Sequence, residues 1–326
     1  MKTLSFIGSD KNAGKTTVLN FVFRKLSEDP GRAVPVCLTS IGINGEEVDT
    51  YEGHPKPSIR LYKGSYFVTA CEHLKELTGR YEICFSFNDF NKLYILGKCL
   101  SDFQVVLEGP NNRQELLRLK KVVGTLLPDS RLLIDGSIDR QFLAHPDISD
   151  GFYFALLISD RKEQLQKAHD LLFSLTLPVC PENHRLFLTT TGIEDRKSIL
   201  YDRENKILYH GSEMPSLDDN LKDACMKCKD SKTSLYLNGA FSKSLFSFFA
   251  PFKKLTIILD NFTLYQNISV GENLGPRFSP EIFLLHPVRV NTIFLREDAG
   301  ETAFPGLPQD IPIINLFREN PHEIRI

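Results

Sequence analysis

The sequence lacks a strong excess of charge of either sign. It carries 39 basic and 41 acidic side chains in 326 residues, which gives a formal net charge of −2. Proteins that bind nucleic acid or anionic membranes through their overall field carry a clear excess of lysine and arginine. The composition therefore implies neither nucleic acid nor a membrane as a partner.

Long apolar runs and a targeting segment are missing as well. No stretch approaches the roughly 20 apolar residues needed to span a bilayer. The chain runs from Met1 directly into an apolar strand pattern, without a charged or apolar leader. Seven cysteines, an odd number scattered along the chain, do not suggest a disulfide framework. We therefore expect a soluble, cytoplasmic protein with reduced thiols.

One pair of cysteines, Cys225 and Cys228, has Cys-x-x-Cys spacing. A structural zinc site needs a second pair at set spacing, and a redox motif follows a strand at the start of a helix. Neither context is visible around these residues. Lys222, Lys227 and Lys229 lie nearby and could lower the pKa of a thiol. A metal or redox role therefore stays open beside the simpler interpretation of surface or packing cysteines.

The strongest motif lies near the N-terminus, where residues 3–26 predict a buried strand, a loop and a helix. Gly14, Lys15 and Thr16 stand at the start of this helix. A nucleotide triphosphate needs inward-facing backbone N–H groups, a flexible cation and a hydroxyl for magnesium, and these residues offer all three. We predict that Lys15 holds the β- and γ-phosphates and that Thr16 binds the metal. As a loop residue, Lys15 is expected to add little to the stability of the fold.

The spacing of this motif is a variant of the usual one. The usual pattern places a glycine five positions before Gly14, where this chain has Ser9, and Gly8 stands one residue earlier. Counted from Ser9, the loop has the usual length. The alternative is a solvated helix start without a ligand. The residues predicted to bind the nucleotide are Ser9, Asp10, Lys11, Asn12, Ala13, Gly14, Lys15, Thr16 and Thr17.

Strands and helices alternate after this motif. Residues 34–39 predict a second strand, and a strand, helix and strand in succession form a crossover unit with parallel strands. The apolar runs 83–87 and 93–96 predict a hairpin. Residues 40–58 predict a long loop at the carboxyl end of a strand, and loops of this length inside a compact domain are usually either functional or disordered. Further strands are expected at 66–69, 103–107, 131–135 and 152–158, and helices at 71–78, 112–127 and 162–175.

A break rich in proline at 175–183 predicts a domain boundary, which divides the chain into residues 1–178 and 179–326. The fold class expected is α/β. The first domain is predicted to be a mostly parallel sheet with helices on both faces, and the second a smaller α/β region. In the second domain, strands are expected at 186–190, 199–201, 207–209, 235–238, 255–259, 288–295 and 311–316.

Carboxylates that could hold magnesium stand where predicted strands end. Two strands end in an acidic residue followed by glycine, and these acids are Glu108 and Asp135. We predict both as catalytic residues together with Lys15, and both as metal ligands together with Thr16. Asp49, in the acidic loop, is a third candidate ligand. The alternatives are that an acid after a strand caps the next helix and that a loop acid only faces water.

Two further residues after the strand at 131–135 bear on the site. Arg140 could reach a phosphate group or form an ion pair with the neighbouring Asp139.

The choice of nucleotide base is indicated only by an absence, because neither Asn91-Lys92 nor Asn205-Lys206 continues into the Asn-Lys-x-Asp pattern that many GTPases use for guanine. ATP with Mg²⁺ is therefore the default ligand, and GTP stays open.

Residues 11–17, with the sequence Lys-Asn-Ala-Gly-Lys-Thr-Thr, resemble the P-loop of the molybdopterin-guanine dinucleotide accessory proteins and their dethiobiotin synthetase relatives. This resemblance covers roughly the first half of the chain. In dethiobiotin synthetase a strand that ends in Glu-Gly, here at Glu108, also borders the substrate site. The resemblance implies a P-loop NTPase fold and a site for ATP and magnesium.

A longer match, which includes residues 39–42, 135–140 and 314–316, is similar to the reactivase subunit of adenosylcobalamin-dependent lysine aminomutase. Glu108 and Ser137 stand where that family has alanine. The resemblance implies an ATPase that expels damaged cobalamin from a cobalamin-dependent aminomutase, which would be its protein partner. The alternatives are an ATP-dependent kinase or ligase of the dethiobiotin synthetase type, and a nucleotide sensor that does not hydrolyse its ligand.

Overall fold

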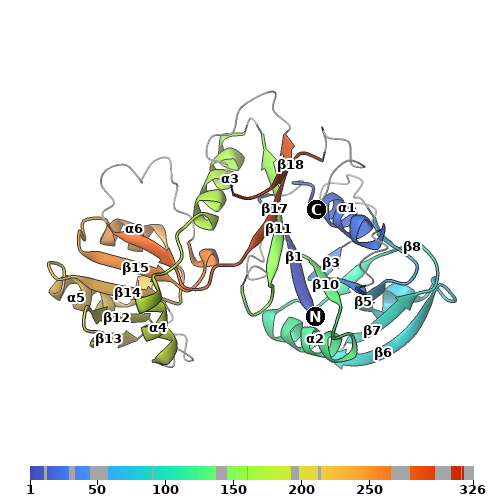
Figure 1. Ribbon diagram of the computed structural model, residues 1–326, viewed down its shortest axis with the longest axis horizontal. Coiled ribbons are helices and arrows are strands. Elements are labelled where there is room, and N and C mark those ends of the chain that lie inside the picture. Colours follow the sequence, from blue (N-terminus) through green and yellow to red (C-terminus); the bar gives the residue numbers. More distant parts are fainter. Residues whose placement is uncertain are drawn as a thin grey trace. The chain divides into compact units, whose positions relative to one another are not determined.

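The computed structural model describes residues 1–10, 13–28, 34–44, 58–89, 92–136, 145–159, 161–191, 198–211, 214–265, 280–297, 310–316 and 318. These residues form two compact units, which Figure 1 shows as ribbons. The first unit contains the described residues up to Ser159 and those from Val288 onward. The second contains those between Arg161 and Pro287.

A nine-stranded sheet forms the centre of the first unit, in the order β18-β17-β11-β1-β10-β2-β5-β7-β6. Every neighbouring pair from β18 to β5 is parallel, whereas β5, β7 and β6 pair antiparallel. The predicted mostly parallel sheet and the hairpin are thus confirmed. The strands are β1 (Lys2–Gly8), β2 (Val36–Ser40), β5 (Tyr66–Ala70), β6 (Tyr81–Asp89), β7 (Lys92–Cys99), β10 (Arg131–Asp135), β11 (Gly151–Ile158), β17 (Val290–Glu297) and β18 (Ile313–Ile314).

The central strands are apolar because both faces of the sheet are covered. All eight residues of β11 are buried, as are all five of β2, which is typical of parallel strands. Helix α1 (Lys15–Glu28) buries Val18, Leu19, Val22 and Phe23 in the same core as strand residues such as Phe6. This spacing is that of one helical face. Helix α2 (Arg113–Leu126) buries Leu116, Leu119 and Val123 in the same way.

The strand predicted at 103–107 is wrong as a member of the main sheet. The chain forms two short strands here, β8 (Phe103–Val105) and β9 (Leu107–Gly109), which pair antiparallel with β4 (Ile59–Leu61) and β3 (Gly42–Asn44). Ser40 lies at this point, and its hydroxyl oxygen is within hydrogen-bond distance of the carbonyl oxygens of Leu107, at 2.8 Å, and of Gly42, at 2.5 Å. Gly109 lies so close that a Cβ atom there would stand 1.8 Å from the Ser40 carbonyl oxygen. β9 therefore lies against the end of β2.

The second unit contains a five-stranded sheet in the order β13-β12-β14-β15-β16. β14, β15 and β16 are parallel, and β12 is antiparallel to both of its neighbours. The expected smaller α/β region is thus confirmed. The strands are β12 (Ser198–Asp202), β13 (Ile207–Gly211), β14 (Thr233–Leu237), β15 (Leu255–Leu259) and β16 (Glu281–Leu284), and the helices are α3 (Lys162–Leu175), α4 (Glu182–Thr190), α5 (Asp219–Lys227) and α6 (Lys243–Phe249).

The strand predicted at 186–190 is wrong, since these residues form the second half of α4. Their β-branched and apolar composition favours a strand. The helix instead buries Leu188 in a core with Tyr201, and the hydroxyl of Thr190 donates to the carbonyl oxygen of Leu186 four residues earlier. Tertiary packing outweighs local propensity here. β16 and α5 were not expected from the sequence.

The division into two units differs from the expected one at 178/179. The proline-rich break lies between α3 and α4, inside the second unit, and the boundary lies before α3. The chain then returns to the first unit, where β17 pairs in parallel with β11. The second unit is thus an insertion, and only long-range strand pairing makes this visible. None of the described helices is long and apolar enough to cross a membrane.

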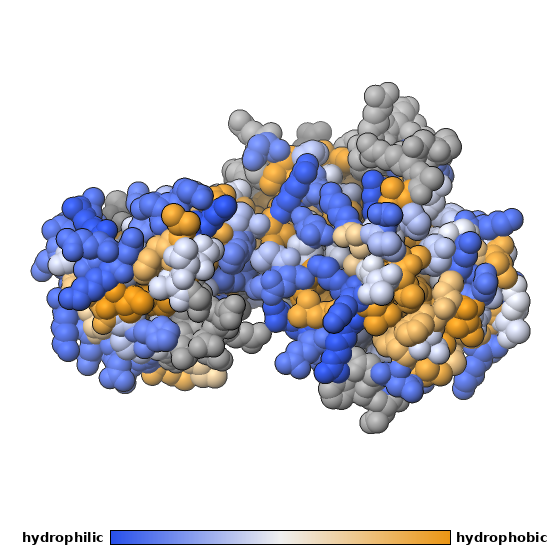
Figure 2. Space-filling model, turned by 60° about the horizontal axis from the view of Figure 1, so that its bottom comes forward, coloured by the Kyte–Doolittle hydropathy of each residue, from blue (hydrophilic) through white to orange (hydrophobic). Residues whose placement is uncertain are grey.

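Exposed apolar side chains concentrate on the β6–β7 hairpin of the first unit. Ile83, Phe85 and Leu93 have exposed fractions of 57%, 40% and 41%. Figure 2 shows hydrophobic surface on this part of the first unit. The side chains of β6 stand at the edge of the sheet, where fewer neighbours cover them.

Candidate functional site

The loop between β1 and α1 is the predicted phosphate-binding loop. Its first residue, Ser9, has an exposed fraction of 1% and is bonded to β11 twice. The Ser9 N–H donates to the carbonyl oxygen of Ala155, and the Ser9 hydroxyl oxygen accepts from the N–H of Leu157, both at 2.9 Å. Ser9, which replaces the usual glycine, therefore holds the start of the loop on the neighbouring strand.

Gly14 turns the end of this loop into α1. Its φ of +86° lies in the left-handed region, which favours glycine. Its carbonyl oxygen accepts from the N–H of Val18 at 2.9 Å, which closes the first helical turn. Ala13 is buried, and its N–H donates to the carbonyl oxygen of Asp10 at 3.3 Å. The glycine before the lysine is thus required by the backbone path.

The first turn of α1 suits an anion. The first N–H groups of any α-helix have no carbonyl partner within it, and the helix dipole adds positive potential there. No acidic residue lies in the first turn of α1. In α2 the corresponding position is filled, because the Asn112 side chain accepts from the N–H of Glu115. Thr16 and Thr17 lie half-buried in this first turn of α1.

Lys15 and Asp135, which the sequence predicts as parts of one site, lie together. The Lys15 Nζ atom is 3.1 Å from Asp135 Oδ1, and the exposed fractions of the two side chains are 16% and 0%. Asp135 ends β10, beside Phe6 of β1 and Ser40 of β2. No hydrogen bond from the described residues reaches either of its carboxylate oxygens. Within the described part of the chain, the Lys15 ammonium is therefore the counter-charge of this buried carboxylate, at the carboxyl edge of the sheet.

The carboxylate of Glu108 belongs to a different group. Its Oε2 atom is 2.7 Å from His73 Nε2, and its Oε1 atom contacts the ammonium of Lys92. Burial alone would raise the pKa of Glu108, but the hydrogen bonds from Lys92 and His73 outweigh it and the pKa lies below its ordinary value. The described ion pairs of the Glu108 carboxylate are thus with these two residues rather than with Lys15. This differs from the prediction that Glu108 joins Lys15 and Asp135.

Sequence reasoning missed His73 and Lys92. His73 belongs to the short 3₁₀ helix η1 (Cys71–Leu74), directly after β5, and Lys92 begins β7. Neither residue belongs to a recognisable motif, and antiparallel pairing of β5 with β7 is what brings their strand ends to one edge. The signal available in the sequence was a histidine near the start of the helix predicted at 71–78, which follows a predicted strand.

Several predicted residues lie outside the described part of the chain. They include two from the predicted phosphate-binding loop, a candidate metal ligand and two charged residues after β10. The structure places none of them. They are Lys11, Asn12, Asp49, Asp139 and Arg140.

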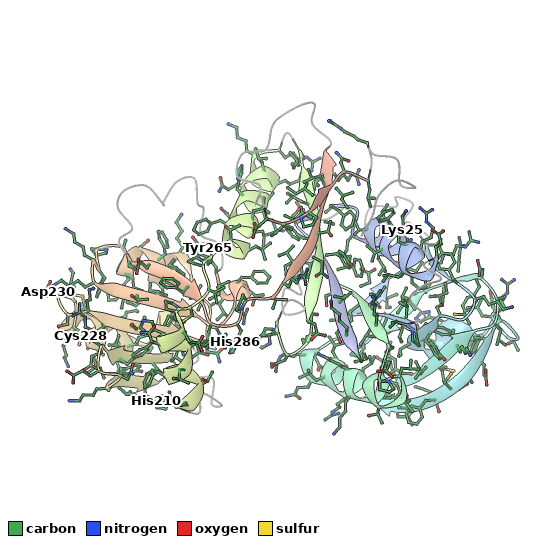
Figure 3. All side chains as sticks on the ribbon, in the orientation of Figure 1. Lys25, His210, Cys228, Asp230, Tyr265 and His286 are labelled. Atoms are coloured by element: carbon green, nitrogen blue, oxygen red, sulfur yellow. The ribbon has the colours of Figure 1, made fainter. Side chains whose placement is uncertain are left out.

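The Cys225 and Cys228 pair lies at the end of α5, in the second unit, where Figure 3 labels Cys228. Burial, reinforced by the neighbouring Cys228, raises the pKa of Cys225 to about 12. The negative end of the helix dipole also disfavours a thiolate at this position. All seven cysteines are free. The geometry therefore favours packing cysteines over a redox pair.

Comparison of the chain with known proteins identifies no relative. No protein-family model, no curated protein and no solved structure matches the chain significantly. The arrangement of Ser9, Gly14, Lys15 and Asp135 between β1, α1 and β10 is therefore the basis for a functional proposal.

Proposed function

We propose that the first unit binds the triphosphate of a nucleotide, with Mg²⁺, at the loop between β1 and α1, and hydrolyses it. The observation that supports this most is the ion pair of Lys15 with the buried Asp135 at the N-terminus of α1. A lysine on a helix start and a carboxylate on the adjacent strand end are two of the parts that phosphoryl transfer needs. Both stand at the carboxyl edge of a parallel sheet, where α/β proteins bind ligands.

The pair suggests how the site changes when it is occupied. The Lys15 ammonium would leave Asp135 and bind the β- and γ-phosphates, which the N–H groups of the first turn of α1 also contact. The Asp135 carboxylate and the Thr16 hydroxyl would then hold Mg²⁺, which supplies charge neutralisation for the phosphates. Each charge that is freed gains a new partner, so the buried Asp135 is not left uncompensated.

The resemblance to the reactivase subunits, rather than the geometry, extends the proposal to a protein partner. On this extension, hydrolysis of ATP drives the release of damaged cofactor from a cobalamin-dependent aminomutase. ATP is the proposed nucleotide by default, with GTP as the alternative. A hydrolysis rate that rises when a cobalamin-dependent aminomutase is added would support this extension. A hydrolysis rate that no such mutase changes would argue against it.

Titration of the full chain with ATP and Mg²⁺, followed by a phosphate-release assay, tests the proposal. Lys15→Ala should reduce hydrolysis by about 10²–10³, the effect of losing one electrostatic contact to the transition state. Lys25→Ala is the matched control, because Lys25 lies in the last turn of the same helix, where its ammonium is 5.8 Å from the ring centre of Phe21 (Figure 3). The control should retain full activity. Equal binding and hydrolysis by the Lys15 variant and the parent would refute the proposal.

A further inference from the structure

A second group of charged side chains stands at the end of β5. Glu72 and His73 lie on η1, directly after this strand, and Glu108 reaches them from β9. One ligand atom from each of the three residues lies within 4.8 Å of the other two. Glu108 is fixed in place by its backbone as well, since its N–H donates to the hydroxyl of Thr69 at 2.9 Å. The group combines one imidazole with two carboxylates.

The ammonium of Lys92 stands between the two carboxylates. It contacts Oε1 of Glu108 and lies 3.4 Å from Oε1 of Glu72. The packing of the chain thus places a positive charge at the point where the acidic side chains meet. When His73 is neutral, the two carboxylates and the one ammonium sum to a net charge of −1. Part of this negative charge is buried, because Glu108 has an exposed fraction of only 2%.

We propose that Glu72, His73 and Glu108 bind a divalent transition-metal ion, in the place that the Lys92 ammonium takes when no metal is there. Exchange of a single positive charge for a double one brings the group to neutrality. Imidazole with carboxylates suits ions such as Zn²⁺, Co²⁺ and Mn²⁺, whereas Mg²⁺ prefers oxygen ligands alone. This site is distinct from the proposed nucleotide site, whose Lys15 and Asp135 make none of these contacts.

The side chains that would have to move are the accessible ones. Metal–ligand bonds of about 2.0–2.2 Å require ligand atoms closer together than the present limit of 4.8 Å. The Glu72 and Lys92 side chains are 57% and 38% exposed, so Glu72 can rotate inward while Lys92 turns to water. The Nε2 atom of His73 already lies 2.7 Å from the Oε2 atom of Glu108. The proton between them would move to Nδ1 of His73, or be released, when Nε2 binds the metal.

Titration of the full chain with Co²⁺, without nucleotide, tests this inference. Calorimetry gives the affinity, and the visible absorption of cobalt reports whether nitrogen and oxygen or sulfur atoms bind it. We expect His73→Ala to weaken Co²⁺ binding by at least about tenfold. Loss of a residue that only supports a metal ligand already lowers metal affinity by about this factor, and loss of the ligand itself should lower it no less. Lys92→Met removes the competing charge while keeping most of the length of the side chain, and should tighten binding by about tenfold.

Two controls separate this site from other effects. Lys98→Met removes a lysine from the same strand, β7, whose ammonium lies over Tyr66 and away from the cluster, and should leave Co²⁺ affinity unchanged. Asp135→Asn disables the proposed nucleotide site and should also leave the Co²⁺ affinity unchanged. Failure of the metal proposal can therefore be distinguished from failure of the nucleotide proposal. Circular dichroism and thermal unfolding verify that each variant is folded.

Three results would overturn the inference. The first is a wild-type protein that binds Co²⁺ no better than the folded His73→Ala variant. The second is a Lys92→Met variant that binds no more tightly than wild type, because the ammonium would then not compete for the site. The third is a sulfur-to-cobalt absorption band, which would assign the ion to thiols such as the exposed Cys71 or Cys84.

Discussion

Lys15→Ala should destabilise the first unit even when no nucleotide is present. The Asp135 carboxylate is fully buried, and the Lys15 ammonium, 3.1 Å away, is its counter-charge. No hydrogen bond from the described residues reaches the two carboxylate oxygens. Removal of the ammonium therefore leaves a buried carboxylate without the counter-charge that it has among the described residues. This reverses the sequence-based expectation that a loop lysine adds little stability.

The burial of the pair sets the magnitude of the effect. Loss of one partner of a buried ion pair costs about 3–5 kcal/mol. Because the Lys15 side chain keeps an exposed fraction of 16%, water can partly replace it, and we expect the lower end of that range, about 3 kcal/mol. Asp135→Asn removes the buried charge itself and leaves a lysine that can turn to water, so a loss of only about 1 kcal/mol is expected. The double variant should resemble Asp135→Asn.

Urea unfolding without nucleotide, followed by circular dichroism, measures these free energies. The chain contains no tryptophan, so tryptophan fluorescence cannot serve as the probe. Lys25→Ala, at the far end of the same helix, controls for the general loss of a lysine from α1. Two results would refute the reasoning: a Lys15→Ala variant as stable as the Lys25→Ala control, or a double variant whose loss equals the sum of the two single losses.

Further predictions concern the residues that shape the site. Gly109→Ala should destabilise the first unit by more than about 2 kcal/mol, since its Cβ would stand 1.8 Å from a backbone oxygen. Gly124→Ala lies inside α2, where the added Cβ would have its nearest neighbour at 3.5 Å, and should instead stabilise the first unit by about 0.5–1 kcal/mol. Urea unfolding of both variants checks that the two changes in the free energy of unfolding have opposite signs. Ser9→Ala leaves the buried N–H of Leu157 without its acceptor and should cost about 1–3 kcal/mol by the same measurement. The pKa of Glu108 is lowered below its ordinary value of 4.5, so its contribution to stability is full above that pH and is lost as the pH falls through the folded-state pKa. The stability difference between wild type and Glu108→Gln should therefore shrink as the pH is lowered from 6 toward 3, and a difference that grows would contradict the assignment.

Local patterns in the sequence determined the elements around the candidate site. The buried strand before Gly14, the helix after it and the acid at the end of β10 are each encoded within a few residues, by apolar runs and a glycine that the backbone path requires. That Asp135 would lie at the same edge of the sheet as the loop followed from the same pattern, because parallel strands of an α/β sheet end at one edge. The pairing of β1 with β10, which sets Phe6 beside Asp135, is seen only in the fold.

Only the tertiary structure decided where more distant segments lie. β17 joins the first unit by pairing with β11, although more than a hundred residues separate the two strands in the chain. Glu108 is turned toward His73 and Lys92 because β9 leaves the main sheet, which no local pattern shows. Local propensity depends on neighbours in sequence, whereas strand pairing and the burial of a charge depend on which segments meet in space. For this reason the sequence predicted the strand, the glycine and the helix around the proposed phosphate-binding loop, and the fold decided that Asp135 rather than Glu108 pairs with Lys15.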